Sequence, residues 1–147
     1  MRTGVTIHET VKELDAGPIA AQEAFPIGPA DDAGAVFARA AATAARLLDA
    51  VLADPDPVLV PQDADGVTYA ARIEPADRVL DPARPAEELV RTVRALSPHI
   101  GARAELHGRP LTVWQARVGE DGGFEPIEVQ PDGGRRMDAA AWLRGLR

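Results

Sequence analysis

The sequence contains no cysteine and no asparagine among its 147 residues. The missing thiols exclude a disulfide-stabilised scaffold, a thiolate nucleophile and a zinc site built on sulfur. The missing asparagine excludes any mechanism that draws an Asn side chain from this chain itself. No apolar run approaches the roughly 18 residues of a membrane span, and residues 1–6 lack the apolar stretch of a signal peptide. We therefore expect a cytoplasmic protein without a membrane partner.

Aromatic, histidine and serine residues are also scarce. Aromatic residues make up 4% of the chain, so a mostly aliphatic core is expected from the 46% that is hydrophobic. The three histidines, His8, His99 and His107, lie far apart without metal-ligand spacing, so no metal site is expected. Ser97 is the only serine, and no Gly-x-Ser-x-Gly sequence surrounds it. Few side chains are left for nucleophilic or metal chemistry.

Positive charge is carried almost entirely by arginine and is unevenly distributed. Fifteen of the sixteen basic residues are arginine, and the net charge is −7. Residues 1–66 hold four basic and eleven acidic side chains, whereas residues 67–147 hold twelve of each. This pattern is compatible with ordinary solvated surface and also with a polyanion-binding module in the second half. Both interpretations stay open on charge alone, because phosphate binding requires cations clustered on one face.

The first third of the chain has the pattern of two strands and a helix. Alternating apolar residues predict a strand over 3–9, and a second strand is predicted over 18–27. Apolar residues at helical spacing predict a helix over 33–53, with Asp31 and Asp32 placed to cap its beginning.

Aspartate and proline residues gather directly after the predicted helix. Residues 54–66 include four aspartates and three prolines, and proline cannot continue the hydrogen bonds of a helix. This composition indicates a linker over 59–66 between one domain of residues 1–58 and another of residues 67–147.

The second domain has the pattern of several short strands with two helices. Strands are predicted over residues 67–73, 102–106, 110–118 and 124–130. A helix is predicted over 85–96, and Asp138 is placed to cap a short terminal helix that contains Trp142. His107-Gly108 is typical of a tight hairpin turn. These elements predict a small, partly closed β-barrel.

Short sequences in both predicted domains resemble methionyl-tRNA formyltransferases. In the first domain, Thr3–Ile7 reads TGVTI, and Leu14–Gly17 reads LDAG where the family reads LDTG. In the second domain, Thr68–Ile73 resembles the family's ATYAPKI, with Arg72 at the usual lysine position, and Leu111–Trp114 follows in the expected order. Each motif is weak alone, but the ordered series covers nearly the whole chain.

The resemblance implies an α+β fold. A β-hairpin and helix, the remnant of an α/β formyltransferase domain, would precede an OB-like small β-barrel with one or two helices. Members of the family transfer a formyl group from 10-formyltetrahydrofolate to the amine of methionyl initiator tRNA. The family's Asn-x-His catalytic segment is absent from this sequence. We therefore expect the isolated chain to be inactive and to bind no folate by itself, with initiator methionyl-tRNA as its partner.

The resemblance also implies functional residues. Asp15 stands at the aspartate of the family motif that arranges proton transfer as the substrate amine attacks the formyl carbon, a role for which a carboxylate is suited. In the second domain, the family contacts the tRNA acceptor arm mainly through phosphates. The candidate tRNA-binding residues are Arg72, which is the strongest, and then Arg78, Arg91, Arg94 and Arg103. Trp114 is interpreted as a core residue rather than a base-stacking platform.

Two other functions stay open. The chain could act as a stand-alone OB-like module that binds tRNA or another polyanion without catalysis. It could also keep the formyltransferase ancestry with a sugar amine or another small amine as acceptor, which the resemblance around Tyr69 and Arg72 argues against. Residues 1–58 alone leave apolar surface uncovered, so we expect either a homodimer through this apolar face or partial disorder of these residues.

Overall fold

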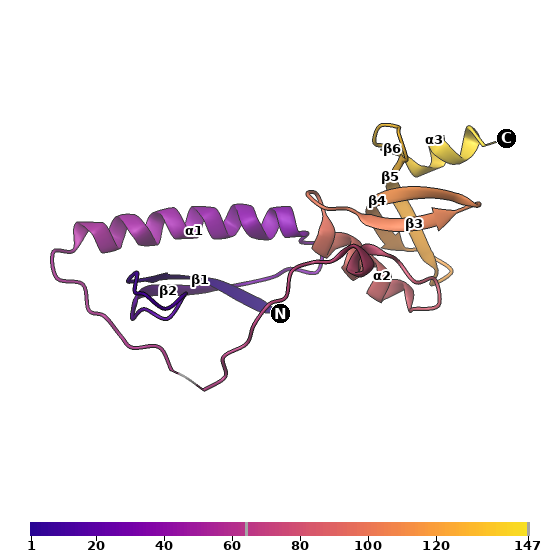
Figure 1. Cartoon of the computed structure of the whole chain (residues 1–147). Helices are drawn as coiled ribbons and strands as arrows, with labels where there is room; N and C mark the ends of the chain where they lie inside the picture. The colour runs from indigo at the N-terminus through magenta and orange to yellow at the C-terminus, as the bar shows by residue number, and fades with distance from the viewer. Residues whose placement is uncertain (64, 147) are drawn as a thin grey trace. The chain divides into compact units, whose positions relative to one another are not determined.

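The computed structural model describes residues 1–63 and 65–146. Contacts divide the chain into two units, which are described separately here (Figure 1). The first unit comprises Met1–Asp31 and Ala35–Ala71, and the second comprises Asp32–Gly34 and Arg72–Arg147. The described residues form three α-helices and two antiparallel sheets, which confirms the predicted α+β class. Within them, no helix combines the length and apolar character that crossing a membrane requires.

The first unit contains a β-hairpin and one long helix. Strand β1 (Arg2–His8) pairs antiparallel with β2 (Ile19–Pro26), and α1 (Ala33–Ala53) follows after a short connection. The two strands and the helix confirm the elements predicted for this part of the sequence. The helix ends at the Asp-Pro sequence, as expected from the missing amide donors of proline.

Arginine side chains connect α1 to the second strand of the hairpin. The Arg39 Nη1 donates to the Pro26 carbonyl oxygen at 2.7 Å and to Asp31 Oδ2 at 3.0 Å. About two helical turns further along α1, Arg46 forms an ion pair with Glu23. These contacts hold the helix along β2.

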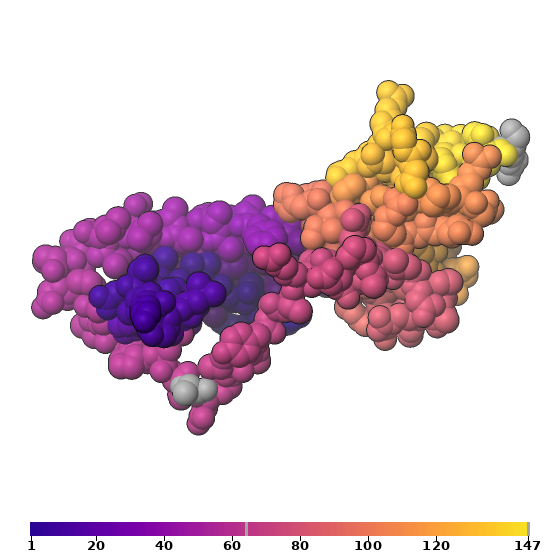
Figure 2. Space-filling view, in the orientation of Figure 1, coloured from indigo at the N-terminus to yellow at the C-terminus, as the bar shows by residue number. Residues whose placement is uncertain are grey.

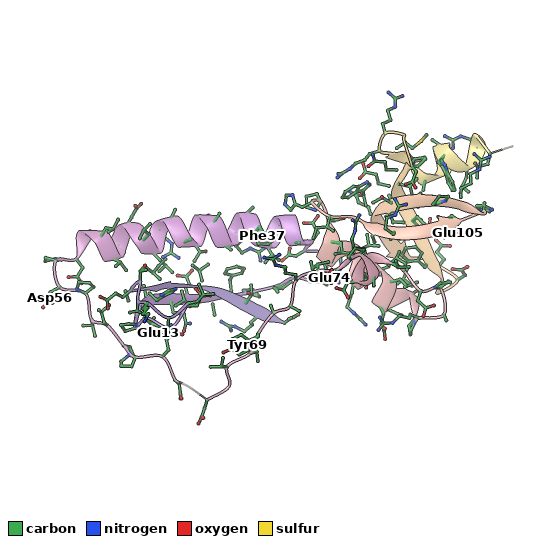
Figure 3. All side chains as sticks on the ribbon, in the orientation of Figure 1. Glu13, Phe37, Asp56, Tyr69, Glu74 and Glu105 are labelled. Atoms are coloured by element: carbon green, nitrogen blue, oxygen red, sulfur yellow. The ribbon has the colours of Figure 1, made fainter. Side chains whose placement is uncertain are left out.

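The first unit buries very few hydrophobic side chains. Among its described residues, Phe25 is the one hydrophobic side chain that is buried, at 7% exposure. On α1, Leu48 is 44% exposed and Leu52 is 74% exposed, and Phe37, labelled in Figure 3, is 65% exposed. Since burial of apolar surface is the main force that stabilises a fold, this unit lacks a core of its own.

The second unit is a four-stranded antiparallel sheet with two helices. The strands lie in the order β3 (Ala102–Leu106), β4 (Arg109–Val118), β5 (Phe124–Pro131) and β6 (Met137–Asp138). The helices are α2 (Ala86–Leu96), which precedes the sheet, and α3 (Ala139–Arg144), which follows it. The elements confirm the helices and three of the strands predicted for this half of the chain.

Local residues explain how the sheet is connected. His107 and Gly108 have φ angles of +52° and +69°, the combination of a type I′ turn, and this turn matches the twist of the flanking strands. Asp138 caps α3, because its side chain accepts a hydrogen bond from the Ala141 amide at 2.8 Å. Both features agree with the sequence-based predictions.

A hydrophobic core lies between the sheet and its two helices. Its largest fully buried side chains are Leu111, Val93, Val113 and Val129. They come from β4, β5 and α2, and Trp142 of α3 is buried beside them at 7% exposure. The core is mostly aliphatic, as the composition predicted.

The predicted strand over residues 67–73 is wrong. This segment has no strand structure, and its apolar side chains Val67, Tyr69 and Ile73 are 57%, 95% and 51% exposed (Tyr69 in Figure 3). Its alternating pattern therefore has no buried face to occupy. Beside β3, one residue outside the named strands pairs with the sheet: Val79 forms a single parallel bridge to Arg103. This bridge does not extend into a fifth strand. The described sheet is open, with four strands.

Candidate catalytic loop and nucleic-acid interface

Asp15 lies in the loop that joins β1 to β2. Its φ angle of +55° is in the left-handed region, which aspartate tolerates better than most residues. The carboxylate is 81% exposed, and its Oδ1 lies 3.8 Å from Nε2 of His8 at the end of β1. The loop thus presents a carboxylate to solvent beside an imidazole.

The orientation of the His8 ring follows from its second contact. Nδ1 lies 2.9 Å from the Glu9 carbonyl oxygen, and a carbonyl oxygen only accepts, so Nδ1 carries the hydrogen. In a neutral ring, Nε2 then faces the Asp15 carboxylate with its lone pair.

A residue distant in sequence fixes the conformation of the Asp15 loop. The Gln62 side-chain amide donates to the carbonyl oxygens of Asp15 at 2.8 Å and Gly17 at 2.6 Å. Gly17 cannot be replaced by a larger residue without a steric clash, because a Cβ there would lie 1.8 Å from the Glu9 carbonyl oxygen. Sequence reasoning missed Gln62, which falls in the predicted linker and carries no recognisable motif.

The residues around Asp15 do not form a folate site by themselves. A small-molecule site normally buries most of its ligand in a concave pocket with apolar walls. Here the carboxylate is 81% exposed, and the neighbouring Leu14 is 91% exposed. The loop therefore supplies an exposed carboxylate, and the walls of a pocket for 10-formyltetrahydrofolate would have to come from elsewhere.

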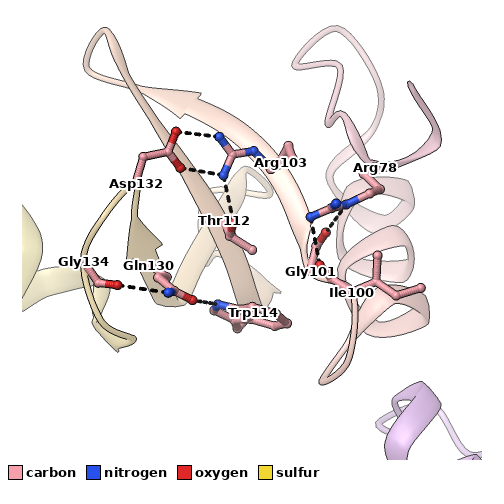
Figure 4. A network of polar contacts seen from close by, with 9 residues as sticks. All are labelled: Arg78, Ile100, Gly101, Arg103, Thr112, Trp114, Gln130, Asp132 and Gly134. Atoms are coloured by element: carbon pink, nitrogen blue, oxygen red, sulfur yellow. Dashed lines mark hydrogen bonds and ion pairs between the residues drawn. The ribbon is translucent and has the colours of Figure 1, made fainter. Parts of the chain in front are cut away.

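Two of the predicted tRNA-binding arginines are engaged inside the second unit (Figure 4). Arg78 donates to the carbonyl oxygens of Ile100 at 2.9 Å and Gly101 at 3.1 Å. Arg103 donates from both terminal nitrogens to Asp132, at 2.7 and 2.9 Å, and also to Thr112 Oγ1 at 3.0 Å. These hydrogen bonds occupy donors of both guanidinium groups, so fewer of their N–H groups remain for an external phosphate.

The hydrogen bonds of the Arg103–Asp132 pair also change its titration. The Arg103 guanidinium donates directly to the Asp132 carboxylate and lowers the pKa of that group below its usual value of 3.8. The same hydrogen bonds raise the pKa of Arg103. The pair is therefore charged, and mutually neutralising, at neutral pH.

The other predicted arginines are differently placed. Arg72 and Arg91 are exposed, and Arg94 on α2 is half-buried. The Nε of Arg94 is buried without a hydrogen-bond partner among the described residues. Arg72, Arg91 and Arg94 thus remain the candidates that could meet phosphate.

The interpretation of Trp114 as a core residue is wrong. Leu111 and Val113 point into the core, and alternation along β4 therefore places Trp114 on the opposite face of the sheet. Its ring is half-buried there, and Nε1 donates to Gln130 Oε1 at 3.0 Å (Figure 4).

Arg136 covers the ring of Trp114. Its Cζ lies 3.4 Å from the centre of the ring, and its Nη2 donates to the Pro98 carbonyl oxygen at 2.9 Å. The segment joining β5 to β6, from which Arg136 comes, stands out from the surface of the second unit in Figure 2. Sequence reasoning missed this residue, since the run Arg135-Arg136 gives no sign that one guanidinium stacks on a ring of β4.

Known proteins are similar to both units of the chain. Residues 72–126 match the family described as formyl transferase, C-terminal domain. The chain is 37% identical, over 99% of its length, to methionyl-tRNA formyltransferase from Halorhodospira halophila, of which it covers 56%. The chain is thus similar to methionyl-tRNA formyltransferases over nearly its whole length, and its residues 72–126 match the C-terminal domain of formyl transferases. It spans about half the length of the curated formyltransferases that it matches.

Solved structures of formyltransferases and related proteins share the fold. A variant of HypX from Aquifex aeolicus matches 99% of the chain with a TM-score of 0.82 at 17% identity, and the match covers 30% of that protein. Methionyl-tRNA formyltransferase from Clostridium thermocellum matches 94% of the chain with a TM-score of 0.67 at 17% identity, over 57% of its own length. The arrangement of elements is therefore that of formyltransferase C-terminal regions.

Proposed function

We propose that this chain provides the C-terminal part of a methionyl-tRNA formyltransferase. The whole enzyme would transfer a formyl group from 10-formyltetrahydrofolate to the amine of methionyl initiator tRNA, in the cytoplasm. The observation that carries the proposal is the 37% identity over 99% of the chain, since it includes both the Asp15 loop and the second unit. A polyanion-binding module alone would not need the hairpin and its loop.

In this proposal Asp15 acts on the proton of the attacking amine. The amine must be neutral to attack and must lose a proton as the amide forms, and an exposed carboxylate can accept it. His8 and Gln62 are positioning residues, because His8 faces the carboxylate and Gln62 holds the backbone of the loop. The developing oxyanion needs separate donors.

Those donors lie outside this chain, which contains no asparagine. The isolated chain is therefore inactive, and we expect no formyl-methionyl-tRNA when it is incubated with the folate donor and charged initiator tRNA. Addition of a separately expressed N-terminal half of the Halorhodospira halophila enzyme should restore product. Turnover by the chain alone would overturn the assignment of the missing catalytic groups. Failure of every reconstitution, with the halves shown to associate, would overturn the proposal itself.

The second unit would bind the tRNA through phosphates. Arg72, Arg91 and Arg94 are the side chains proposed for these contacts, because the structure engages Arg78 and Arg103 elsewhere. Binding of this kind weakens steeply with added salt. Titration of the full chain with initiator tRNA at about 50 and 200 mM salt tests it, and the absence of binding at the lower salt would overturn it.

A module that binds RNA without catalysis is the second candidate. It is favoured by one observation, which is that the second unit has a core of ten buried residues whereas the first has little buried apolar surface. The two candidates differ in reconstitution: the module binds RNA but never supports formyl transfer with an N-terminal half.

We also propose that the isolated chain self-associates through the first unit. Helix α1 leaves Leu48 and Leu52 exposed, and uncovered apolar surface of this kind favours association. In a whole enzyme the same face would pack on the N-terminal half, so the dimer is a property of the chain alone.

A further inference from the structure

Arg136 is one of several arginines of the second unit that take part in none of the ion pairs among the described residues. Arg84, Arg103 and Arg117 form ion pairs with Glu88, Asp132 and Glu125. Arg136 takes part in none of the ion pairs found among the described residues, and its contacts are the Trp114 ring and one carbonyl oxygen. It is exposed, so its positive charge is available to an anion.

We propose that Arg136 binds a backbone phosphate of RNA and that Trp114 is its positioning residue. The inference rests on the proposed tRNA binding and assigns it a contact that the family resemblance did not indicate. A guanidinium has five N–H donors in one plane, and the Pro98 carbonyl oxygen uses one of them. Because the ring contacts the face of the guanidinium, the N–H groups at its edge that Pro98 does not use stay available to phosphate oxygens.

The stack on Trp114 lowers the entropy lost when a phosphate is bound. A cation over an aromatic face is attracted by the ring, and a side chain that is already held loses less freedom on binding. The guanidinium is restrained at two points, by the ring at 3.4 Å and by the Pro98 carbonyl at 2.9 Å. A free surface arginine has neither restraint.

Trp114 is held at its ring and at its backbone. Its Nε1 donates to Gln130, whose amide in turn donates to the Gly134 carbonyl oxygen at 3.0 Å (Figure 4). The Ser97 hydroxyl donates to the Trp114 carbonyl oxygen. Gly101 packs so closely that a Cβ there would lie 2.9 Å from the ring. The platform under Arg136 is therefore rigid.

The surroundings carry charge that suits a polyanion. Arg78 binds the carbonyl oxygens of Ile100 and Gly101, in the same α2–β3 loop whose Pro98 carbonyl holds Arg136. Arg135 is exposed next to Arg136. Of the acids on this face of the sheet, Asp132 is neutralised by Arg103, whereas Glu128 and its cross-strand neighbour Asp138 are opposing charges. RNA phosphate is thus the occupant that the local charge favours.

The test is a salt series of tRNA binding by the full chain, with an initiator tRNA transcript as the probe. Each phosphate contact contributes about 0.9 to the slope of log affinity against log salt, which corresponds to about fivefold in affinity at 0.15 M salt. The Arg136→Ala variant should therefore show a salt slope smaller by about 0.9 and an affinity about fivefold weaker. Arg117→Ala is the matched control, because it removes the same charge from an arginine that Glu125 already neutralises. It should change the slope by less than about 0.3.

Trp114 is tested through its coupling to Arg136. Trp114→Leu should weaken tRNA binding about threefold, with the net charge unchanged, because the guanidinium is no longer held in place. In an Arg136→Ala background the same change should have no further effect, which a merely structural role would not produce. Arg136→Lys keeps the charge and the salt slope and should bind about two- to threefold more weakly. The Arg136→Lys variant still tests the proposed phosphate contact if Trp114→Leu fails to fold.

The outcomes separate the two proposals. Equal slopes for Arg136→Ala and Arg117→Ala, with strong binding by the unaltered chain, would overturn the inference and leave the proposed tRNA binding intact. No binding by the unaltered chain at low salt would overturn both. Independent effects of the Trp114 and Arg136 changes would overturn the positioning role alone.

Discussion

Asp132 and Arg103 face each other across β4. The Asp132 carboxylate accepts one hydrogen bond from each terminal nitrogen of the Arg103 guanidinium, at 2.7 and 2.9 Å. Arg103 comes from β3 and Asp132 directly follows β5, so the pair connects the two strands that flank β4. The bidentate geometry explains why an arginine that the sequence offered as a phosphate ligand is instead part of the sheet's own structure.

The pair makes stability depend on acid pH. The pKa of Asp132 is lowered in the folded state by the hydrogen bonds from Arg103. Its contribution is therefore fully present above the usual value of 3.8 and is lost as the pH falls through the lowered folded value. We expect Asp132→Asn to melt a few degrees lower at neutral pH, since the pair is exposed. Thermal melts between pH 7 and 2 measure the difference.

The two proteins should become equally stable at the acid end of this series. Glu125, whose pKa Arg117 also lowers by hydrogen bonding, is common to both and cancels in the comparison. A difference that grows as the pH falls would contradict the role given to the Asp132 carboxylate.

Gly101 has no substitute at its position. Its φ angle is +78°, and a Cβ there would lie 2.3 Å from Thr112 Cγ2 and 2.9 Å from the Trp114 ring. We expect Gly101→Ala to reduce the free energy of unfolding by about 3 kcal/mol, from backbone strain and overpacking together. Gly108→Ala is the control, because its φ of +69° gives strain without any neighbour within 4 Å. It should lose about 1 kcal/mol, and equal losses in urea titrations would contradict the packing argument.

Leu111 is the centre of the core of the second unit. It is fully buried on β4, so Leu111→Ala should destabilise the unit by about 2–5 kcal/mol. Both tryptophans belong to this unit, and urea denaturation followed by their fluorescence therefore reports on it. Leu143→Ala, at a position that is 41% exposed, should lose less than about 1 kcal/mol. A comparable loss at both positions would show that burial does not decide the effect.

The elements that pack on the core of the second unit could be predicted from the pattern of their apolar residues. The period of two in β4 and the helical spacing in α2 are produced by contact with a common core, so periodicity located them. Residues 67–73 alternate equally well but are exposed, since no neighbouring strand gives them a face to bury. Alternation alone also left the face of Trp114 undecided, because a strand side chain can point to either side of a sheet.

The candidate site was predictable only where a local motif carries it. Asp15 was found by its position in LDAG, whereas Gln62 holds the same loop from 47 residues further along the chain. Arg136 depends on a ring in a different strand and on a carbonyl in a loop before the sheet. Contacts of this kind are produced by tertiary structure and leave no spacing in the sequence.

The uncovered face of the first unit predicts self-association. Light scattering of the full chain should give a mass above that of a monomer, and the combined change Leu48→Asp and Leu52→Asp should return it to the monomer, because charged groups resist burial in an apolar interface. Leu143→Asp places the same charge on an exposed leucine of the second unit and should leave the association unchanged. A monomeric unaltered chain would contradict the prediction.

Asp15 and Gln62 should affect catalysis in different ways. In the reconstituted enzyme, Asp15→Asn removes the proton acceptor and keeps the shape of the side chain, so the rate should fall by about 10²- to 10⁴-fold with little change in tRNA affinity. Gln62→Ala removes the donor to two loop carbonyl oxygens but no reacting group. It should reduce the rate by a smaller factor. Glu13→Gln, an exposed change in the same loop, is the control, and single-turnover assays with charged initiator tRNA measure all three. If Asp15→Asn and Glu13→Gln behaved alike, the loop would be a structural connection and the proton would leave through another group.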